Sequence, residues 1–488
     1  MIRTIVFEDE ITLWWEKSEF AYATKYDVYV DGVFHGSTQY THYTTSGLYA
    51  DTSYEILIQA NVAKQSLRIK TKPAKRKLDV TKAPFFAVGD GKTVCTQVLQ
   101  AALDACKDGD CVYFPKGSYL SGALDVRSNT EIYLDEGAVI QGLTDVEAYL
   151  PKINSRFEGI EQPCYRSLIN MGRLDHQTGC NCRNVVIRGK GSIRGGGVEL
   201  RQNVINAERE LLREYLANNQ EYVKTCENEE TIPGRARGRL INISNTDGVV
   251  LSGISLAYGP SWTIHFTYSK NVVTYGCSIL STGIGNGDGW DPDSSEDCAI
   301  FDCDFYTGDD AIAIKSGKNP EGNVINRPTR NVYVFNCRLY NGHSGVAVGS
   351  EMSGGVKNVY VWDCDFGVAW NGIHIKTTKK RGGYVKNVQV RDSVLSSVFV
   401  QTVEYNDDGE RAPTPPVLQD YLFENITLKG ITHCGHTYYV YLNGFTDDGY
   451  HIKNVCFDGV KVENVSANAA LEYSNVDDIV WKNVEEIS

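Results

Sequence analysis

The second half of the sequence repeats one arrangement, in which polar residues precede a segment that alternates apolar and small side chains. In four consecutive copies the polar residues are Asp288, Asp309-Asp310, His343-Ser344 and Trp370-Asn371. Aligning the copies by their alternation puts Asp288 level with Asp310 and Ser344, and it puts Asp309 level with His343. Three carboxyl groups held this closely repel one another when ionised, which raises the pKa of at least one. A protonated carboxyl group beside an ionised one is suited to general acid–base catalysis.

The segments after these polar residues are predicted to be strands. Their apolar positions, Ile312/Ile314, Val346/Val348 and Ile373/Ile375, should face inward, and the intervening residues should face outward. The outward residues form two columns, Asp291, Ala313, Ala347 and His374 in one, and Asp293, Lys315, Gly349 and Lys376 in the other. Basic residues are therefore expected beside the three aspartates, with small residues leaving room for a ligand.

A simpler role is open to each aspartate by itself. Asp and Asn at such turns often only satisfy backbone N–H groups. That role does not account for three carboxyl groups at adjacent positions, because like charges so close cost free energy unless a reaction or ligand uses them.

A repeat of about thirty residues must position these side chains. Its frame recurs at Asn271, Asp297, Asn331, Asn358 and Asn387, with intervals of 26, 34, 27 and 29 residues, and weaker copies begin at Asn184 and Asn454. Each unit holds short β-rich runs between Gly, Asn, Asp and Ser turns. Such periods are typical of solenoids, and several strands per turn predict an all-β, right-handed parallel β-helix.

Cysteines follow the same frame. Cys277, Cys303, Cys337 and Cys364 each lie six residues after an anchor, and Ser393 takes the next place. Equal offsets predict a file of buried side chains about 4.8 Å apart, rather than converging metal ligands. With 14 cysteines placed in this way, and no basic and apolar leader at the N-terminus, we expect a reducing, cytoplasmic location.

Composition limits the partners. The chain has 488 residues, 42% of them apolar, and a net charge of -13, which argues against nucleic acid and anionic membranes. An acidic substrate would need a local basic pocket, which Lys315 and Lys376 are expected to supply.

Two unequal parts are predicted. Residues 1–72 alternate in short runs, contain the turn Asp31-Gly32, and resemble a fibronectin type III β-sandwich that acts as a spacer. Residues 73–82 form a basic linker, and residues 83–488 form the β-helix.

Four ordered segments carry a resemblance to a known family. They are Asn286-Gly287-Asp288-Gly289-Trp290-Asp291, Gly308-Asp309-Asp310, Gly342-His343-Ser344 and His374-Ile375-Lys376. In order and spacing they resemble glycoside hydrolase family 28, the polygalacturonases, over about residues 80–488. Residues 87–93, which precede a helix-like cap, and residues 259–265 are similar to that family too.

The resemblance implies hydrolysis of α-1,4-galacturonosidic bonds in a pectic oligosaccharide or polysaccharide. Asp309 would be the general acid, Asp288 and Asp310 would hold and deprotonate water, and His343 would tune the carboxyl groups. Substrate contacts are expected from Lys376, His374, Asp291, Lys315, Tyr405 and His265. A water between acid and base gives inversion when the carboxyl groups are roughly 6.5–9.5 Å apart. No metal or cofactor is required.

Two features modify this expectation. The family's usual Arg-x-Lys is His374-Ile375-Lys376 here, which removes a guanidinium that could hold a carboxylate with two hydrogen bonds. An insertion over about 198–239 contains a helical pattern at 207–216. In this family such insertions can close one end of the cleft, so exo action is expected.

Other functions stay open. A related hydrolase could act on rhamnogalacturonan or another modified pectin backbone, and a non-catalytic carbohydrate-binding solenoid is the simplest alternative. A pectate lyase would need calcium ligands and a basic proton abstractor, which the pair Asp309-Asp310 does not favour.

Overall fold

The computed structural model describes residues 1–487 except residues 225, 227, 404–406, 408, 434–435, 464 and 466–468. The chain forms two compact units. One comprises residues 1–78 with 107–111, and the other comprises residues 79–106 with 112–488. Among the described residues, no helix is long and apolar enough to cross a membrane.

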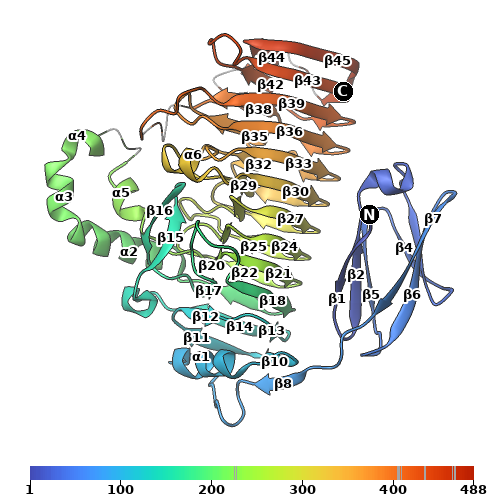
Figure 1. Cartoon of the computed structure of the whole chain (residues 1–488), viewed down its shortest axis with the longest axis vertical. Coiled ribbons are helices and arrows are strands. Elements are labelled where there is room, and N and C mark those ends of the chain that lie inside the picture. The colour runs from blue at the N-terminus through green and yellow to red at the C-terminus, as the bar shows by residue number, and fades with distance from the viewer. Residues whose placement is uncertain are drawn as a thin grey trace. The chain divides into compact units, whose positions relative to one another are not determined.

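The N-terminal unit consists of two antiparallel sheets that share one core. The first sheet contains β1 (Arg3–Val6), β2 (Glu10–Trp14) and β5 (His42–Ser46), and the second contains β4 (Val33–Thr38), β3 (Tyr26–Val30), β6 (Ser53–Ala60) and β7 (Ala63–Lys70) (Figure 1). A short 3₁₀ helix, η1, spans Lys17–Phe20. Trp15, Phe20 and Tyr26 meet edge to face in the core, with ring centroids 5.0–5.8 Å apart. Within the predicted linker 73–82, Arg76–Asp79 forms strand β8.

The second unit is a parallel β-helix, as predicted, with three strands in each of its central coils. Its large sheet consists of two rows of strands. In its central part, one row contains β24 (Lys270–Tyr275), β27 (Glu296–Phe301), β30 (Thr329–Phe335), β33 (Val356–Trp362) and β36 (Tyr384–Arg391). The other row contains β25 (Ser278–Leu280), β28 (Asp304–Tyr306), β31 (Arg338–Asn341), β34 (Asp365–Phe366) and β37 (Val394–Leu395). The same sheet extends through β9 (Asp90–Val94), β10 (Asp110–Phe114), β11 (Gly117–Ser121), β13 (Glu131–Leu134), β14 (Ala138–Gly142), β18 (Cys182–Gly189), β19 (Ser192–Arg194), β21 (Thr246–Ser252) and β22 (Ser255–Ala257) at one end and β39 (Val417–Glu424), β40 (Thr427–Leu428), β43 (Ile452–Glu463) and β45 (Val476–Ile487) at the other.

The third row forms a separate sheet, which we call the site sheet. Its strands are β12 (Leu124–Val126), β17 (Ile169–Met171), β20 (Ile241–Ser244), β23 (Ile264–Thr267), β26 (Trp290–Asp293), β29 (Ile312–Ile314), β32 (Ser344–Val348), β35 (Asn371–Thr377), β38 (Val398–Thr402), β42 (His436–Asn443), β41 (Ile431–His433) and β44 (Ala469–Ser474). The strands from β12 to β42 run parallel at single-coil steps, so a side chain in one strand lies beside its counterpart in the next.

The recurring Asn and Asp anchors are explained by backbone geometry. Asn271, Asp297, Asn331, Asn358 and Asn387 all have positive φ angles, between 55° and 60°. Asn and Asp tolerate this left-handed conformation better than other residues with a side chain. Their side chains also bond from coil to coil, since the amides of Asn358 and Asn387 each donate to the preceding anchor at 2.9 Å. The repeat therefore marks a ladder that fixes the register.

Buried files of like side chains fill the interior. The predicted cysteine file is confirmed: the N–H groups of Asp304, Arg338 and Asp365 bond to the carbonyls of Cys277, Cys303 and Cys337 in the preceding coil at 2.9–3.0 Å. Beside it, an aromatic file contains Tyr275, Phe301, Phe335 and Trp362, whose rings stack with centroids 4.5–5.0 Å apart.

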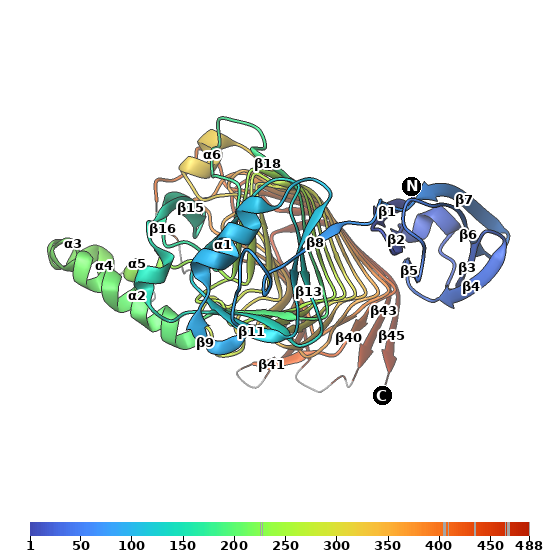
Figure 2. The ribbon, with the colours of Figure 1, turned by 90° about the horizontal axis from the view of Figure 1, so that it is seen from below.

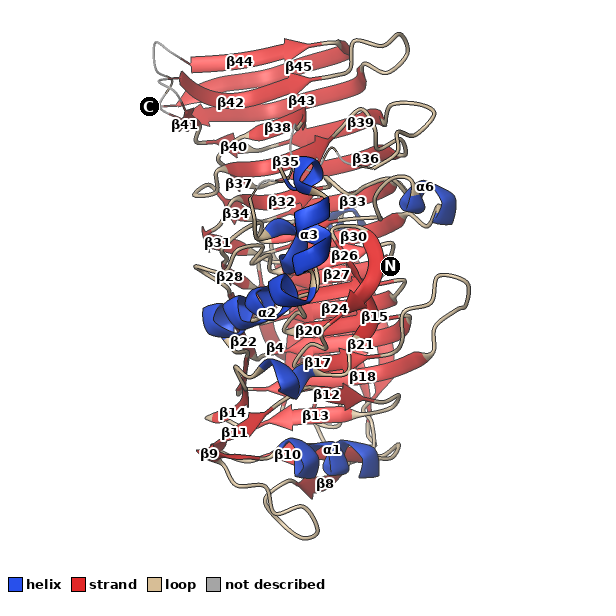
Figure 3. Ribbon diagram, turned by 90° about the vertical axis from the view of Figure 1, so that its left-hand side faces the viewer, coloured by secondary structure: helices blue, strands red, loops and turns tan. Residues whose placement is uncertain are grey.

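Helices and one hairpin extend from the β-helix. Helix α1 (Thr96–Ala105) covers its N-terminal end and buries Leu99, Ala102 and Leu103, which confirms the predicted cap (Figure 2). The hairpin of β15 (Ile153–Phe157) and β16 (Ile160–Cys164) follows the 3₁₀ helix η2 (Val146–Tyr149). The insertion contains α2 (Gly197–Leu211), α3 (Arg213–Asn218), α4 (Gln220–Val223) and α5 (Thr231–Gly234), which project from the side of the site sheet (Figure 3). A short helix, α6, spans Glu321–Ile325.

Removing one ring from the aromatic file should destabilise the β-helix strongly. Phe335 is fully buried between two stacked rings, so Phe335→Ala leaves a cavity and is expected to cost about 3–5 kcal/mol. Urea unfolding monitored by circular dichroism measures the loss. Val324→Ala, at an 83% exposed position, is the control and should leave the midpoint unchanged. Equal midpoints for both variants would contradict the packing described.

Candidate active site

The register of the site sheet confirms the alignment made from the sequence. Trp290 pairs with Ile312, Ile312 pairs with Val346, and Val346 pairs with Ile373. The residues that precede these strands are joined by backbone bonds. The N–H of Gly289 donates to the carbonyl of Asp310 at 3.0 Å, and the N–H of His343 donates to that of Asp309 at 2.9 Å. Asp288 is thus level with Asp310, and Asp309 is level with His343.

These residues line one open cleft of about 360 Å³. Its walls include all four predicted catalytic residues and three of the six predicted substrate contacts. The lining residues are Glu158, Trp262, Asn286, Asp288, Asp309, Asp310, Lys315, His343, Ser344, Gly349, Ser350, Glu351, Trp370, Asn371, His374 and Lys376. The cleft spans the coils that carry β23, β26, β29, β32 and β35, and the hairpin contributes Glu158.

Asp309 is the most accessible of the three aspartates. Its side chain is 24% exposed, and its Oδ1 lies 3.2 Å from Nδ1 of His343. This hydrogen bond, together with the charge of Asp309, raises the pKa of His343 and outweighs the opposing effect of burial. The imidazole also stacks on Trp370, with ring centroids 4.5 Å apart. His343 is therefore oriented and able to hold a proton beside Asp309.

Asp310 is held in its ionised form. Burial favours the neutral acid, but the Lys376 ammonium, 2.8 Å from Oδ2, overcomes this effect and holds the pKa of Asp310 at about 2. An ionised carboxylate at the floor of the cleft can accept a hydrogen bond from a water molecule and orient it.

Asp288 has a raised pKa, in contrast to Asp310. Burial, followed by the charge of Asp309, raises the pKa of Asp288 to about 8, although Lys315 lies 3.5 Å from its Oδ2 and acts against the shift. Lys315 is shared, since its ammonium also lies 3.6 Å from Oε2 of Glu351. Two carboxyl groups on adjacent coils thus differ widely in proton affinity, which is a common property of acid–base pairs.

Two predicted substrate contacts are corrected by the structure. Asp291 and His265 are fully buried and do not line the cleft. His265 Nε2 lies 3.5 Å from Oδ2 of Asp293, and burial lowers its pKa to about 4. Tyr405, the sixth predicted contact, lies outside the described residues.

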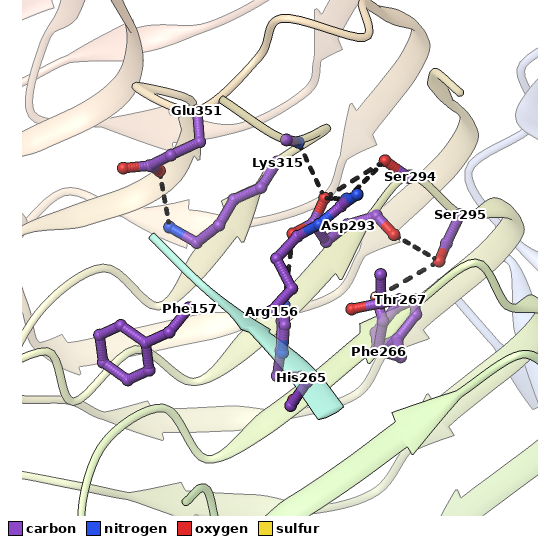
Figure 4. Close-up of polar contacts among 12 residues, drawn as sticks. Arg156, Phe157, His265, Phe266, Thr267, Asp293, Ser294, Ser295, Lys315 and Glu351 are labelled. Carbon is purple, nitrogen blue, oxygen red and sulfur yellow. Dashed lines mark hydrogen bonds and ion pairs between the residues drawn. The ribbon is translucent and has the colours of Figure 1, made fainter. Parts of the chain in front are cut away.

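A buried ion pair fastens the hairpin to the site sheet. Nη1 of Arg156 donates to Oδ1 of Asp293 at 2.8 Å and to Oγ of Ser294 at 2.9 Å, and both charged side chains are fully buried (Figure 4). The next residue, Phe157, stacks on Trp262 with centroids 4.6 Å apart. These contacts hold the hairpin as a fixed wall over the β23–β26 end of the cleft.

The tip of the wall is joined to the helical insertion. Glu158 lines the cleft, and its Oε2 accepts a hydrogen bond from Nε of Arg235, which follows α5, at 2.7 Å. Sequence reasoning missed Glu158 and Glu351, because neither belongs to the repeated columns and both reach the cleft only through tertiary folding. It also predicted a basic pocket, whereas the described lining contains five carboxyl groups and two ammonium groups.

No metal site accompanies the cluster in the part of the chain that the structure describes. No group of three or more His, Cys, Asp or Glu side chains there is arranged to hold a metal ion. Among the described residues, the cationic contacts of Asp288, Asp309 and Asp310 come from Lys315, His343 and Lys376.

The fold and the site define the class of protein. Residues 156–481 match the model for glycosyl hydrolases family 28, which covers two thirds of the chain. The chain therefore belongs to this family and is a glycoside hydrolase.

The individual relatives have low sequence identity to this chain. A probable polygalacturonase of Vitis vinifera is 27% identical over 410 residues, covering 80% of this chain and 74% of the relative. An exo-poly-alpha-D-galacturonosidase of Dickeya chrysanthemi is 24% identical, covering 88% and 75%. Among solved structures, a family 28 exopolygalacturonase of Yersinia enterocolitica has a TM-score of 0.82 at 21% identity, covering 100% and 98%. An exopolygalacturonase of Thermotoga maritima has a TM-score of 0.68 at 26% identity, covering 83% and 92%.

Breaking the buried ion pair should loosen the wall. Arg156→Met leaves the Asp293 carboxylate buried without its guanidinium, which is expected to cost about 3–5 kcal/mol. Limited proteolysis should then cleave within residues 153–164, where the native hairpin resists. Arg213→Met removes an exposed arginine paired with Glu210 and is the control. Equal protection of the hairpin in both variants would refute the role of Arg156.

Proposed function

We propose that this protein hydrolyses α-1,4-galacturonosidic bonds in galacturonan or its oligosaccharides, with inversion and from one end of the chain. The observation that carries the proposal is the grouping of Asp288, Asp309, Asp310 and His343 in one open cleft. Family membership and the polygalacturonase names of its relatives support the substrate class.

The environments of the carboxyl groups suggest their roles. Asp309 is the general acid, since it is the most exposed of the three and lies against a histidine that can supply a proton. Asp310 is the base, because Lys376 keeps it ionised. Asp288, which retains its proton, donates a hydrogen bond to the attacking water and positions it. Acid and base lie at the mouth and the floor of the cleft, and a water molecule between them would give inversion.

Exo action follows from the wall. An internal segment of a polysaccharide must run through a groove that is open at both ends. We propose that the hairpin, whose Glu158 lines the cleft, blocks its β23 end. Phe157 on Trp262 and Glu158 bonded to Arg235 hold the hairpin in place. We propose that a terminal sugar occupies this end, so that the enzyme releases short products from one terminus.

The N-terminal unit and the cysteines support two secondary proposals. The two sheets of residues 1–78 are consistent with a fibronectin type III module that serves as a spacer. The buried file of Cys277, Cys303, Cys337 and Cys364 consists of thiols rather than disulfides, which supports function in a reducing compartment such as the cytoplasm.

Product analysis on defined oligogalacturonides tests the proposed activity. The wild type should release short products from one end, and Asp309→Asn should lower kcat by at least about a hundredfold, because general acid catalysis contributes on the order of 10²–10⁴. Asp448→Asn, at an exposed position, is the control and should retain full activity. No cleavage by the wild type, or full activity of Asp309→Asn, would refute the assignment.

The pH dependence of kcat/KM tests whether Asp288 acts in its protonated form. Since the pKa of Asp288 is raised to about 8, its carboxyl group holds a proton below that pH and loses it above, so kcat/KM should fall as pH rises through about 8. Lys315 lowers this pKa, and Lys315→Met should therefore move the alkaline limb to higher pH. Lys379→Met, which alters a surface pair with Asp447, is the control and should not move it. An alkaline limb that Lys315→Met leaves unchanged, or moves to lower pH, would contradict a catalytic role for the proton on Asp288.

A further inference from the structure

One end of the cleft is lined by residues of the coil that carries β35. Trp370, Asn371, His374 and Lys376 lie there, two coils beyond the strand that follows Asp309 and Asp310 and away from the hairpin wall. Gln401 in the next strand, β38, contacts His374. We call these five residues the His374 subsite.

The charges around this subsite are unfavourable for an anion. Five carboxyl groups line the cleft, and within the described residues its only permanent cations are the ammonium groups of Lys315 and Lys376. Lys376 lies 2.8 Å from Asp310, and Lys315 lies within 3.6 Å of both Asp288 and Glu351. Each ammonium group thus already has a carboxyl neighbour, and no guanidinium belongs to the described lining.

His374 is built into the subsite as a neutral group. Its Nδ1 lies 3.4 Å from the side-chain amide of Asn371, and its Nε2 lies 3.2 Å from that of Gln401. The ring meets Phe399 edge on, with centroids 6.3 Å apart. Burial, followed by the charge of Lys376, lowers the pKa of His374 to about 3. No carboxylate faces either ring nitrogen at hydrogen-bond distance among the contacts that the structure describes.

The remaining groups suit an uncharged sugar. Asn371, Gln401 and the imidazole can exchange hydrogen bonds with hydroxyl groups or an ester carbonyl. Trp370 is 61% exposed, and its ring offers an apolar surface on which a sugar face or a methyl group can pack. A free carboxylate would be better held by a guanidinium, which binds both oxygens at once.

We infer that the His374 subsite selects a sugar unit without a free carboxylate, either the methyl ester of galacturonate or a neutral sugar. The inference rests on the proposed function and refines its substrate class. It assigns His374 as the specificity-determining residue of this subsite, because its ring lies between two amides in the cleft lining and offers a bound sugar hydrogen bonds without a positive charge. Lys376 keeps its separate task of holding Asp310 ionised.

The test uses trisaccharides that differ at one ring only, which carries a carboxylate, a methyl ester or a neutral sugar. For the wild type, kcat/KM should be at least tenfold higher when the ring at the His374 subsite is uncharged. Whichever of the two uncharged rings, the methyl ester or the neutral sugar, gives the higher kcat/KM is the kind of sugar unit that the subsite selects. His374→Arg should reverse the preference by at least tenfold, and the conservative His374→Gln should keep it.

Binding to an inactive background keeps the test independent of turnover. Asp309→Asn and the double variant Asp309→Asn/His374→Arg are titrated with the same trisaccharides by calorimetry, and the double variant should gain at least tenfold affinity for the acidic ring. A wild type that prefers the acidic ring, or treats all three alike, would overturn the inference while leaving galacturonan hydrolysis intact. Failure to cleave any of the trisaccharides, with binding retained, would instead overturn the proposed hydrolysis.

Discussion

The regular step between parallel coils is the constraint on which the site depends. A parallel ladder carries each residue directly over its counterpart, so residues 288, 310 and 344 share one column although the intervals between them differ. The extra residues of longer coils are accommodated in turns and in α6, and the ladder of left-handed Asn and Asp residues restores the register each time. Like charges are brought together by the backbone, which explains how an arrangement that electrostatics opposes can persist.

The aspartates of the cluster differ in protonation state because their neighbouring charged residues differ. Asp310 has Lys376 at 2.8 Å and stays ionised, whereas Asp288 shares Lys315 with Glu351 and keeps its proton. The same contacts place a carboxyl group beside each ammonium group of the described cleft lining. An enzyme that acts on an acidic polymer thus has a cleft whose own acids outnumber its cations, and this balance bears on which sugars can lie beside His374.

The architecture and the grouping of the three aspartates with His343 could be predicted from sequence because both follow from local rules. Alternation decides which side chains face outward, and the Asn anchors decide the register, so Asp288, Asp309, Asp310 and His343 could be grouped by their positions in the repeat. The covering elements could not be predicted in this way. Arg156 reaches Asp293 across 137 positions of sequence, and Asp291 and His265, which were expected to contact the substrate, are fully buried. Glu158 and Glu351 likewise reach the cleft through tertiary contacts that no periodicity encodes.

The most direct test of the account is the stereochemistry of hydrolysis. When an acid protonates the leaving oxygen and a base activates water on the opposite face of the sugar ring, the new hydroxyl group arrives on the face opposite the leaving oxygen. Proton NMR of the anomeric region during the first minutes of hydrolysis of an α-linked oligogalacturonide should show the β-anomer of the new reducing end before mutarotation. An initial α-anomer would mean retention, and it would contradict the water-mediated arrangement of Asp288, Asp309 and Asp310.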